Sequence, residues 1–146
     1  MQISSRFTIG LHILTAIDTF QNDYKVTSEF LAGSIQTNPV VVRRILGQLK
    51  NAGLIESSQG VAGITIPKSL DQITFYDVYT AVEPVEEGDL FRFHDSPNPD
   101  CPVGRNIHRL LDGKLREIQN AMEEKMRCYT LADLHDGLDE VLREEA

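Results

Sequence analysis

The stretch Thr27–Ala52 constrains the fold most strongly, because it predicts two short helices joined by a tight turn. Thr27 or Ser28 can cap the first helix by accepting a hydrogen bond from a backbone N–H. Asn38 and Pro39 then begin a second helix, with Asn38 as the cap and Pro39 in the first turn, where its missing N–H does no harm. Two short helices of this kind are what a helix-turn-helix requires.

The second helix has two faces of different chemistry. Its buried face is predicted from helical spacing to consist of Val42, Ile45, Leu46 and Leu49. The other positions, which fall mostly elsewhere on the helix, are Val40, Val41, Arg43, Arg44, Gln48 and Lys50. An exposed basic face can enter a DNA major groove. An ordinary helical hairpin with a solvated basic face would show the same periodicity.

A predicted β-hairpin directly after these helices favours the DNA-binding interpretation. Residues 53–58 end the helix and begin a strand, residues 59–63 form a turn, and residues 64–66 form a second strand. A helix-turn-helix followed at once by a hairpin is the winged-helix arrangement, which is much more specific than either part. We therefore expect a mainly α-helical fold with a small β-hairpin wing.

Charge is distributed unevenly along the chain, whose formal net charge is −8. Residues 1–68 hold six basic and four acidic side chains, which gives a charge of about +2. Residues 69–146 hold eight basic and eighteen acidic side chains, which gives a charge of about −10. DNA binding depends on the local field at the phosphates, so the net charge does not decide the matter. The small basic excess predicts modest affinity per subunit and a need for two subunits.

Length and composition limit the remaining possibilities. The 146 residues suit one domain with an appendage. No apolar run is long enough to span a bilayer and no charged-then-apolar leader is visible, so we expect a cytoplasmic protein without a membrane partner. Two cysteines do not make a disulfide framework.

The chain divides into three predicted parts. Residues 1–82 form the winged helix-turn-helix domain, beginning with a helix over residues 1–20 in which Arg6 either reaches a phosphate or is simply solvated. Residues 83–102 form a proline-containing loop that suits a sensor segment. Residues 103–146 form two helices, the first of which is long.

The long predicted helix, from about Val103 to Arg127, is amphipathic and longer than a small winged domain needs. A helix of this kind usually packs against a twin, although it could also fold back on its own domain. We expect a homodimer whose contact face includes Ile107, Leu111, Leu115, Ile118, Met122 and Met126.

Several segments together resemble the Rrf2 family of bacterial transcription regulators, which includes iron–sulfur sensing and nitric-oxide sensing members. The resemblance runs nearly end to end, and the segments that carry it are residues 1–7, 38–46, 49–55, 59–63 and 71–78. It implies a dimeric winged-helix repressor that reads a palindromic operator on double-stranded DNA. By position, Val40, Val41, Arg43 and Arg44 would face the major groove, and Gln59 and Gly60 at the wing tip would enter the minor groove. Ser28, Asn38 and Pro39, at the starts of the two helices, complete the DNA-binding set together with Arg6.

The cysteines depart from the cluster-binding members of that family, which have three closely spaced cysteines before the long helix. This chain has Cys101 there and Cys128 at the far end of the helix. A [2Fe–2S] cluster normally needs four soft donors, so we expect neither a cluster nor another metal, and the spacing of His94, Cys101 and His108 makes only a weak case for zinc.

Two effectors remain open for the cluster-free branch that this chain resembles. Cys101 precedes a helix N-terminus, where a thiolate is stabilised, so it is a candidate redox sensor, with an inert cysteine as the alternative. Its disulfide partner could be Cys128, the same cysteine of a second subunit, or a small thiol. A small ligand could instead bind between the loop and the winged domain, lined by Leu90, Phe91 and Phe93.

We therefore predict a DNA-binding transcriptional regulator, and its resemblance to the family implies a repressor. The alternative is a winged-helix module that binds a protein partner and does not bind DNA sequence-specifically. An enzyme is not expected, because no Ser/His/Asp arrangement, phosphate-binding glycine loop or metal-spaced histidine pair is visible.

Overall fold

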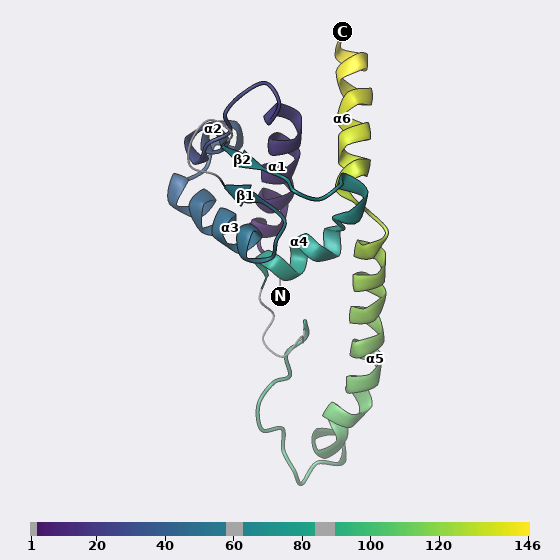
Figure 1. Ribbon diagram of the computed structural model, residues 1–146. Helices are drawn as coiled ribbons and strands as arrows, with labels where there is room; N and C mark the ends of the chain where they lie inside the picture. The colour runs from purple at the N-terminus through teal and green to yellow at the C-terminus, as the bar shows by residue number, and fades with distance from the viewer. Residues whose placement is uncertain (1–2, 58–62, 84–89) are drawn as a thin grey trace.

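The computed structural model describes residues 3–57, 63–83 and 90–146, and the elements below are those found in these ranges (Figure 1). In chain order they are α1 (Ser5–Phe20), α2 (Ser28–Ile35), α3 (Pro39–Asn51), β1 (Glu56–Ser57), β2 (Ile64–Thr65), the 3-10 helix η1 (Leu70–Gln72), α4 (Phe75–Val82), α5 (Pro102–Arg127) and α6 (Leu131–Glu145). The predicted fold class, mainly α-helical with a two-stranded hairpin, is confirmed.

The helix starts follow from side chains that satisfy the free backbone N–H groups of a first turn. Thr27 Oγ1 accepts a hydrogen bond from Phe30 N at 3.1 Å, which caps α2. A capping box starts α4, in which Thr74 and Asp77 each accept from the other's backbone N–H. The first helix begins at Ser5, later than predicted, because Ser4 is its cap.

The hydrophobic core joins the first four helices to the hairpin. It is built from fully buried aliphatic side chains, which include Ile13, Ile17, Leu31, Ile45 and Val78. Helix α1 packs against α2, α3 and α4, so it is the centre of the winged domain. Burial of this apolar surface is the main stabilising contribution to the domain.

The hairpin is short and antiparallel, with Glu56 opposite Thr65 and Ser57 opposite Ile64. Ile66, predicted to extend the second strand, instead donates its N–H to Gln21 Oε1 at 3.1 Å. The strand therefore ends at Thr65 and is fastened to the loop after α1.

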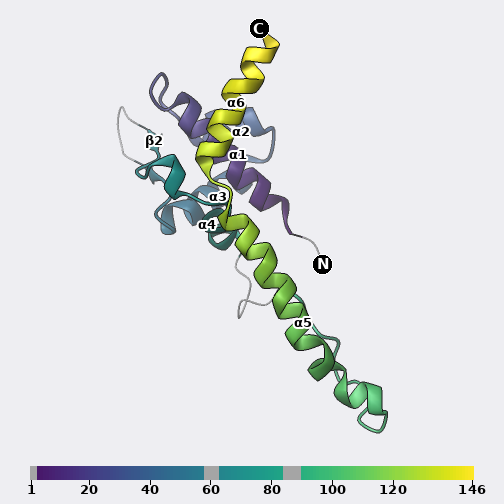
Figure 2. The ribbon, with the colours of Figure 1, turned by 90° about the vertical axis from the view of Figure 1, so that its right-hand side faces the viewer.

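Helix α5 begins at a point distant from the winged domain and runs toward it, and α6 continues onward beside α1 (Figures 1 and 2). Residues 90–101 run antiparallel to α5, because Leu90 N donates to Gln119 Oε1 at 2.8 Å and Phe93 packs on His108, nearer the start of the helix. The described part of the loop thus lies along α5.

An ion pair fastens the C-terminal helix to the first helix. His135 Nδ1 of α6 lies 2.7 Å from Asp18 Oδ2 of α1, and Asp139 lies 3.5 Å from the other ring nitrogen. The hydrogen bond to Asp18 and the charge of that carboxylate raise the pKa of His135, with smaller contributions from Asp139 and Asp136. Asp71 of η1, which also packs against α6, bonds to the Ser69 hydroxyl instead.

We expect this pair to make stability depend on pH. Because the folded pKa of His135 is raised, its contribution is fully present below the ordinary histidine pKa and is lost as pH rises through the raised value. Since His135 is 44% exposed, the contribution is below about 1 kcal/mol. Urea unfolding at pH 6 and pH 8 checks this: the difference between wild type and Asp18→Asn should be larger at pH 6. Equal differences at both pH values would contradict the assignment.

Candidate nucleic-acid interface

The turn between α2 and α3 leaves the start of α3 exposed to solvent. Gln36 adopts a left-handed conformation, with φ 58°, and donates its N–H to Ala32 O at 2.8 Å, which ends α2. Asn38 Oδ1 accepts from Val40 N at 2.8 Å and Pro39 occupies the first turn, as predicted. Both Asn38 and Pro39 are exposed, so the polar N-terminus of α3 faces outward.

The two faces of α3 are those predicted from the sequence. Val42, Ile45, Leu46 and Leu49 are buried, and Val40, Arg43, Arg44 and Lys50 are exposed. Neither Arg43 nor Arg44 has an ion pair or hydrogen bond with any described residue. Two guanidinium groups are therefore available for phosphates or base edges on one outward face.

Three residues of the predicted DNA-binding set have other contacts. Val41 is half-buried and packs against the core, so only part of its side chain remains for a groove. The Arg6 guanidinium lies 3.7 Å from Glu83, whose carboxylate also accepts from Ser4 N at 2.9 Å. We expected Arg6 either to reach a phosphate or to be solvated, and this internal ion pair differs from both expectations. The Ser28 hydroxyl lies 3.4 Å from Glu29 Oε2.

The wing is fixed to both ends of the helix-turn-helix. Lys50 Nζ at the end of α3 donates to Ser57 Oγ of β1 at 3.0 Å. At the start of α2, Ile64 N donates to Val26 O at 3.1 Å. Gln59 and Gly60, predicted to enter the minor groove, lie outside the described residues.

Helix α5 has no buried residue, although it is strongly amphipathic. Its apolar residues divide into two groups. Leu111, Leu115, Met122 and Met126 are half-buried, whereas Val103, Leu110 and Ile118 are 63%, 58% and 54% exposed. Of the predicted contact residues, Ile118 is thus the most exposed, and Ile107 is half-buried. We call Val103, Leu110 and Ile118 the outer stripe of α5.

Cys101 is the N-cap residue of α5 and is half-buried. The backbone N–H groups of Gly104 and Val103 lower the pKa of its thiol, which agrees with the expected stabilisation of a thiolate at a helix start. Cys128 lies at the opposite end of the same helix, roughly 39 Å away by helical rise, whereas a disulfide needs Cα atoms about 4–7 Å apart. A bond between the two cysteines of one chain, which the sequence left open, is therefore excluded.

Two of the residues predicted to line a ligand site beside the winged domain, Phe91 and Phe93, pack against α5 instead. Phe91 and Phe93 line a cavity of about 20 Å³ against α5, together with Asp112, Leu115, Arg116 and Gln119, and not against the winged domain. That volume suits about one water molecule. Sequence reasoning missed Gln119, which anchors the loop, because nothing local relates it to Leu90.

The histidines near Cys101 do not converge on a metal site. His108 Nε2 lies 3.3 Å from the backbone carbonyl of His94, and the two rings meet edge to face at 5.7 Å. Within residues 3–57, 63–83 and 90–146, no group of three or more His, Cys, Asp or Glu side chains could hold a metal ion. In the same ranges, no helix has the length and apolarity needed to cross a membrane.

The fold and its basic outward helix define a winged helix-turn-helix protein. Residues 3–137 match the model of the Rrf2 family, described as an iron-dependent transcriptional regulator, so the chain belongs to the Rrf2 family of transcriptional regulators. The chain is 41% identical over 136 residues to YwnA of Bacillus subtilis (strain 168), named as an HTH-type transcriptional regulator; the match covers 93% of this chain and 98% of YwnA.

Solved structures agree with this assignment. A crystal structure described as that of a DNA-binding protein is 37% identical, with a TM-score of 0.71, and the match covers 89% of this chain and 98% of that one. CymR, the global cysteine regulator of B. subtilis, shares the fold at 20% identity with a TM-score of 0.69, over 93% of this chain and 97% of CymR. The predicted family and class of function are thereby confirmed.

Proposed function

We propose that this regulator binds a palindromic operator as a homodimer and represses transcription. The observation that carries the proposal is the pair of exposed arginines, Arg43 and Arg44, which have no partner among the described residues and lie on a helix whose opposite face is buried. One such helix covers only a few base pairs, so two copies related by a twofold axis are needed to read a full site. A regulator that binds chromosomal DNA also fits the expected cytoplasmic location.

The outer stripe of α5 supports the homodimer. Three large apolar side chains exposed on one amphipathic helix are unfavourable in water, and a second copy of the same helix would cover them. An isologous contact relates the two reading helices by a twofold axis, which is the symmetry of a palindrome.

Selection of bound sequences from a random duplex pool tests the proposal. We expect inverted repeats whose half-site centres are about 34–36 Å, or one helical turn, apart, or a multiple of that distance. Recovery of single half-sites without symmetry, or of no enriched sequence at low salt, would contradict it.

We further propose that oxidation of Cys101 controls operator binding. The thiolate attacks one oxygen of a peroxide, the O–O bond breaks, hydroxide leaves, and the sulfur becomes a sulfenic acid. The support is the favoured thiolate at the end of α5, the helix proposed to carry the dimer contact. We propose no metal or iron–sulfur cofactor, because the segment before α5 offers one thiol.

The lowered thiol pKa gives a direct prediction. In a Cys128→Ser variant, the rate of alkylation of Cys101 by iodoacetamide should rise with pH at a midpoint below that of an ordinary cysteine, because the thiolate is the nucleophile. The same variant unfolded in urea is the control and should show the ordinary midpoint. An identical midpoint in folded and unfolded protein would remove the basis for a sensor at Cys101.

A further inference from the structure

The loop between α1 and α2 lies beside the wing and is held there from both ends. Gln21 accepts the N–H of Ile66 at its start, and Val26 accepts the N–H of Ile64 at its end. Val26 also forms an isolated bridge with Gly63. The intervening residues Asp23, Tyr24 and Lys25 are all exposed, so this loop forms an outer edge between the start of α2 and the hairpin.

Gly63 is what allows this close approach. Its φ of 68° favours glycine, and a Cβ there would lie 2.7 Å from Val26 O and 3.0 Å from Cγ of Lys25. The aliphatic stem of Lys25 therefore lies directly against the backbone of the wing. Its ammonium group has no ion pair with any described residue.

The neighbouring Tyr24 presents a polar group in a fixed place. Its ring stacks on Phe30 at 6.2 Å with an interplanar angle of 25°, and meets Phe20 edge to face at 5.9 Å. The residue is nevertheless 59% exposed, and its hydroxyl makes no hydrogen bond within the described residues. An aromatic side chain held rigidly at the surface with an unused hydroxyl is suited to binding an external acceptor.

We propose that Lys25 and Tyr24 bind the phosphate backbone of the operator, beside the start of α2 and the hairpin. A lysine ammonium and a tyrosine hydroxyl are both common phosphate ligands, and such contacts fix the position of a protein on DNA without reading its sequence. The inference rests on the proposed function, and it adds residues outside α3 and the wing tip to the interface.

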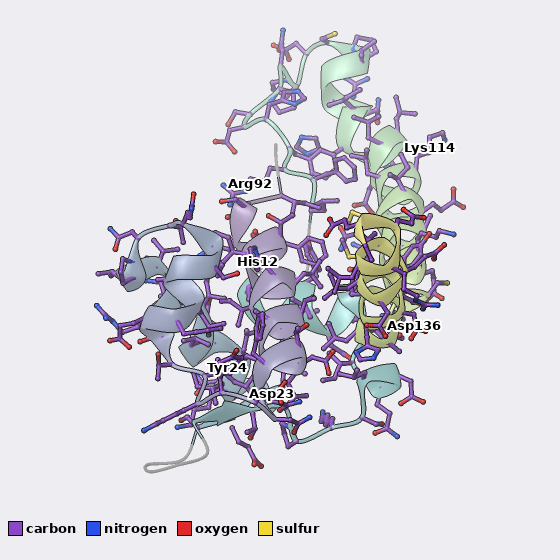
Figure 3. All side chains as sticks on the ribbon, turned by 90° about the horizontal axis from the view of Figure 1, so that it is seen from above. His12, Asp23, Tyr24, Arg92, Lys114 and Asp136 are labelled. Carbon is purple, nitrogen blue, oxygen red and sulfur yellow. The ribbon has the colours of Figure 1, made fainter. Side chains whose placement is uncertain are left out.

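A substitution of Asp23 should change DNA affinity in the opposite direction to a substitution of Lys25. The Asp23 carboxylate is exposed in the same loop, beside Tyr24 (Figure 3), where it would repel the phosphates that Lys25 attracts. Asp23→Asn should therefore strengthen binding, and a partly unfolded variant could not produce that result. Asp136 on α6 lies away from this loop in the same view, and Arg143 is exposed farther along α6, so these two residues offer matched charge controls.

The experiment measures affinity against salt concentration for a selected operator and for an unrelated duplex. Lys25→Ala should weaken binding to both duplexes by a similar factor, about three- to tenfold, and lower the slope of log affinity against log salt by about 0.9. Tyr24→Phe keeps the stacked ring and should weaken binding about two- to fivefold through loss of one hydrogen bond. Asp23→Asn should strengthen it about twofold.

The controls Arg143→Ala and Asp136→Asn should leave affinity and slope unchanged. A Lys25→Ala protein with the wild-type slope, or an equal effect of Arg143→Ala, would overturn the phosphate contact while leaving the operator proposal intact. If wild-type protein binds neither duplex at low salt, the proposed function fails and this contact fails with it.

Discussion

Replacement of Arg43 and Arg44 by alanine should reduce operator affinity by about a hundredfold or more. Each guanidinium is exposed on α3 without a partner in the described part of the chain, so its loss should remove the proposed contacts to DNA and leave the contacts seen within the fold intact. A good bidentate contact from arginine to a base contributes about 1–3 kcal/mol, and two such losses combine. Fluorescence anisotropy with the selected operator measures the change.

The matched control removes two positive charges from the C-terminal helices. Arg109→Ala with Arg143→Ala should leave affinity nearly unchanged, because both side chains are exposed on α5 and α6, and Arg109 lies away from the outer stripe. The helical content and the oligomeric state of the Arg43/Arg44 variant should match those of wild type. Duplex binding that survives the double substitution would favour the alternative in which the winged fold binds a protein.

Ile118→Glu should separate the subunits and, as a consequence, abolish binding to the palindrome. In a single chain Ile118 is 54% exposed, so the glutamate is accommodated without disturbing the protomer. In a dimer formed through the outer stripe, it would place a carboxylate in an apolar contact, at a cost on the order of 3 kcal/mol or more. Analytical ultracentrifugation should therefore show a monomer at concentrations where wild type is a dimer.

Asn120→Glu is the matched control on the same helix. Asn120 is exposed and lies two residues from Ile118, about 200° around the helix, on the polar side. It adds the same charge and should leave the dimer intact. A dimeric Ile118→Glu protein would show that the outer stripe is not the interface.

The local features of this fold could be predicted because their causes lie within a few residues. Asn38 next to Pro39 specifies a helix start, and Thr130 with Asp133, three residues later, forms a capping box at the start of α6. The buried face of α3 follows from helical spacing alone. These signals placed α2 and α3 close to their observed ends, and with them the exposed position of Arg43 and Arg44.

The features that could not be predicted depend on contacts distant in sequence. Arg6 pairs with Glu83, and His135 pairs with Asp18 across 117 positions. Nothing in the flanking residues of either member indicates its partner. The contact of Leu90 with Gln119 is of the same kind, so the sequence alone places a possible ligand site between the loop and the winged domain and not against α5.

The placement of Cys101 at the end of α5 that lies away from the winged domain has a mechanical consequence for its proposed sensor role (Figure 1). Helix α5 spans roughly 39 Å, and its other end adjoins the winged domain through α4. If Cys101 is the sensor, the helix would act as a lever: a tilt of about 5° would displace one end by about 3 Å relative to the other, close to the 3.4 Å rise of one base pair. A chemical change confined to one sulfur atom would be amplified by this arm into a mismatch of a whole step along the duplex.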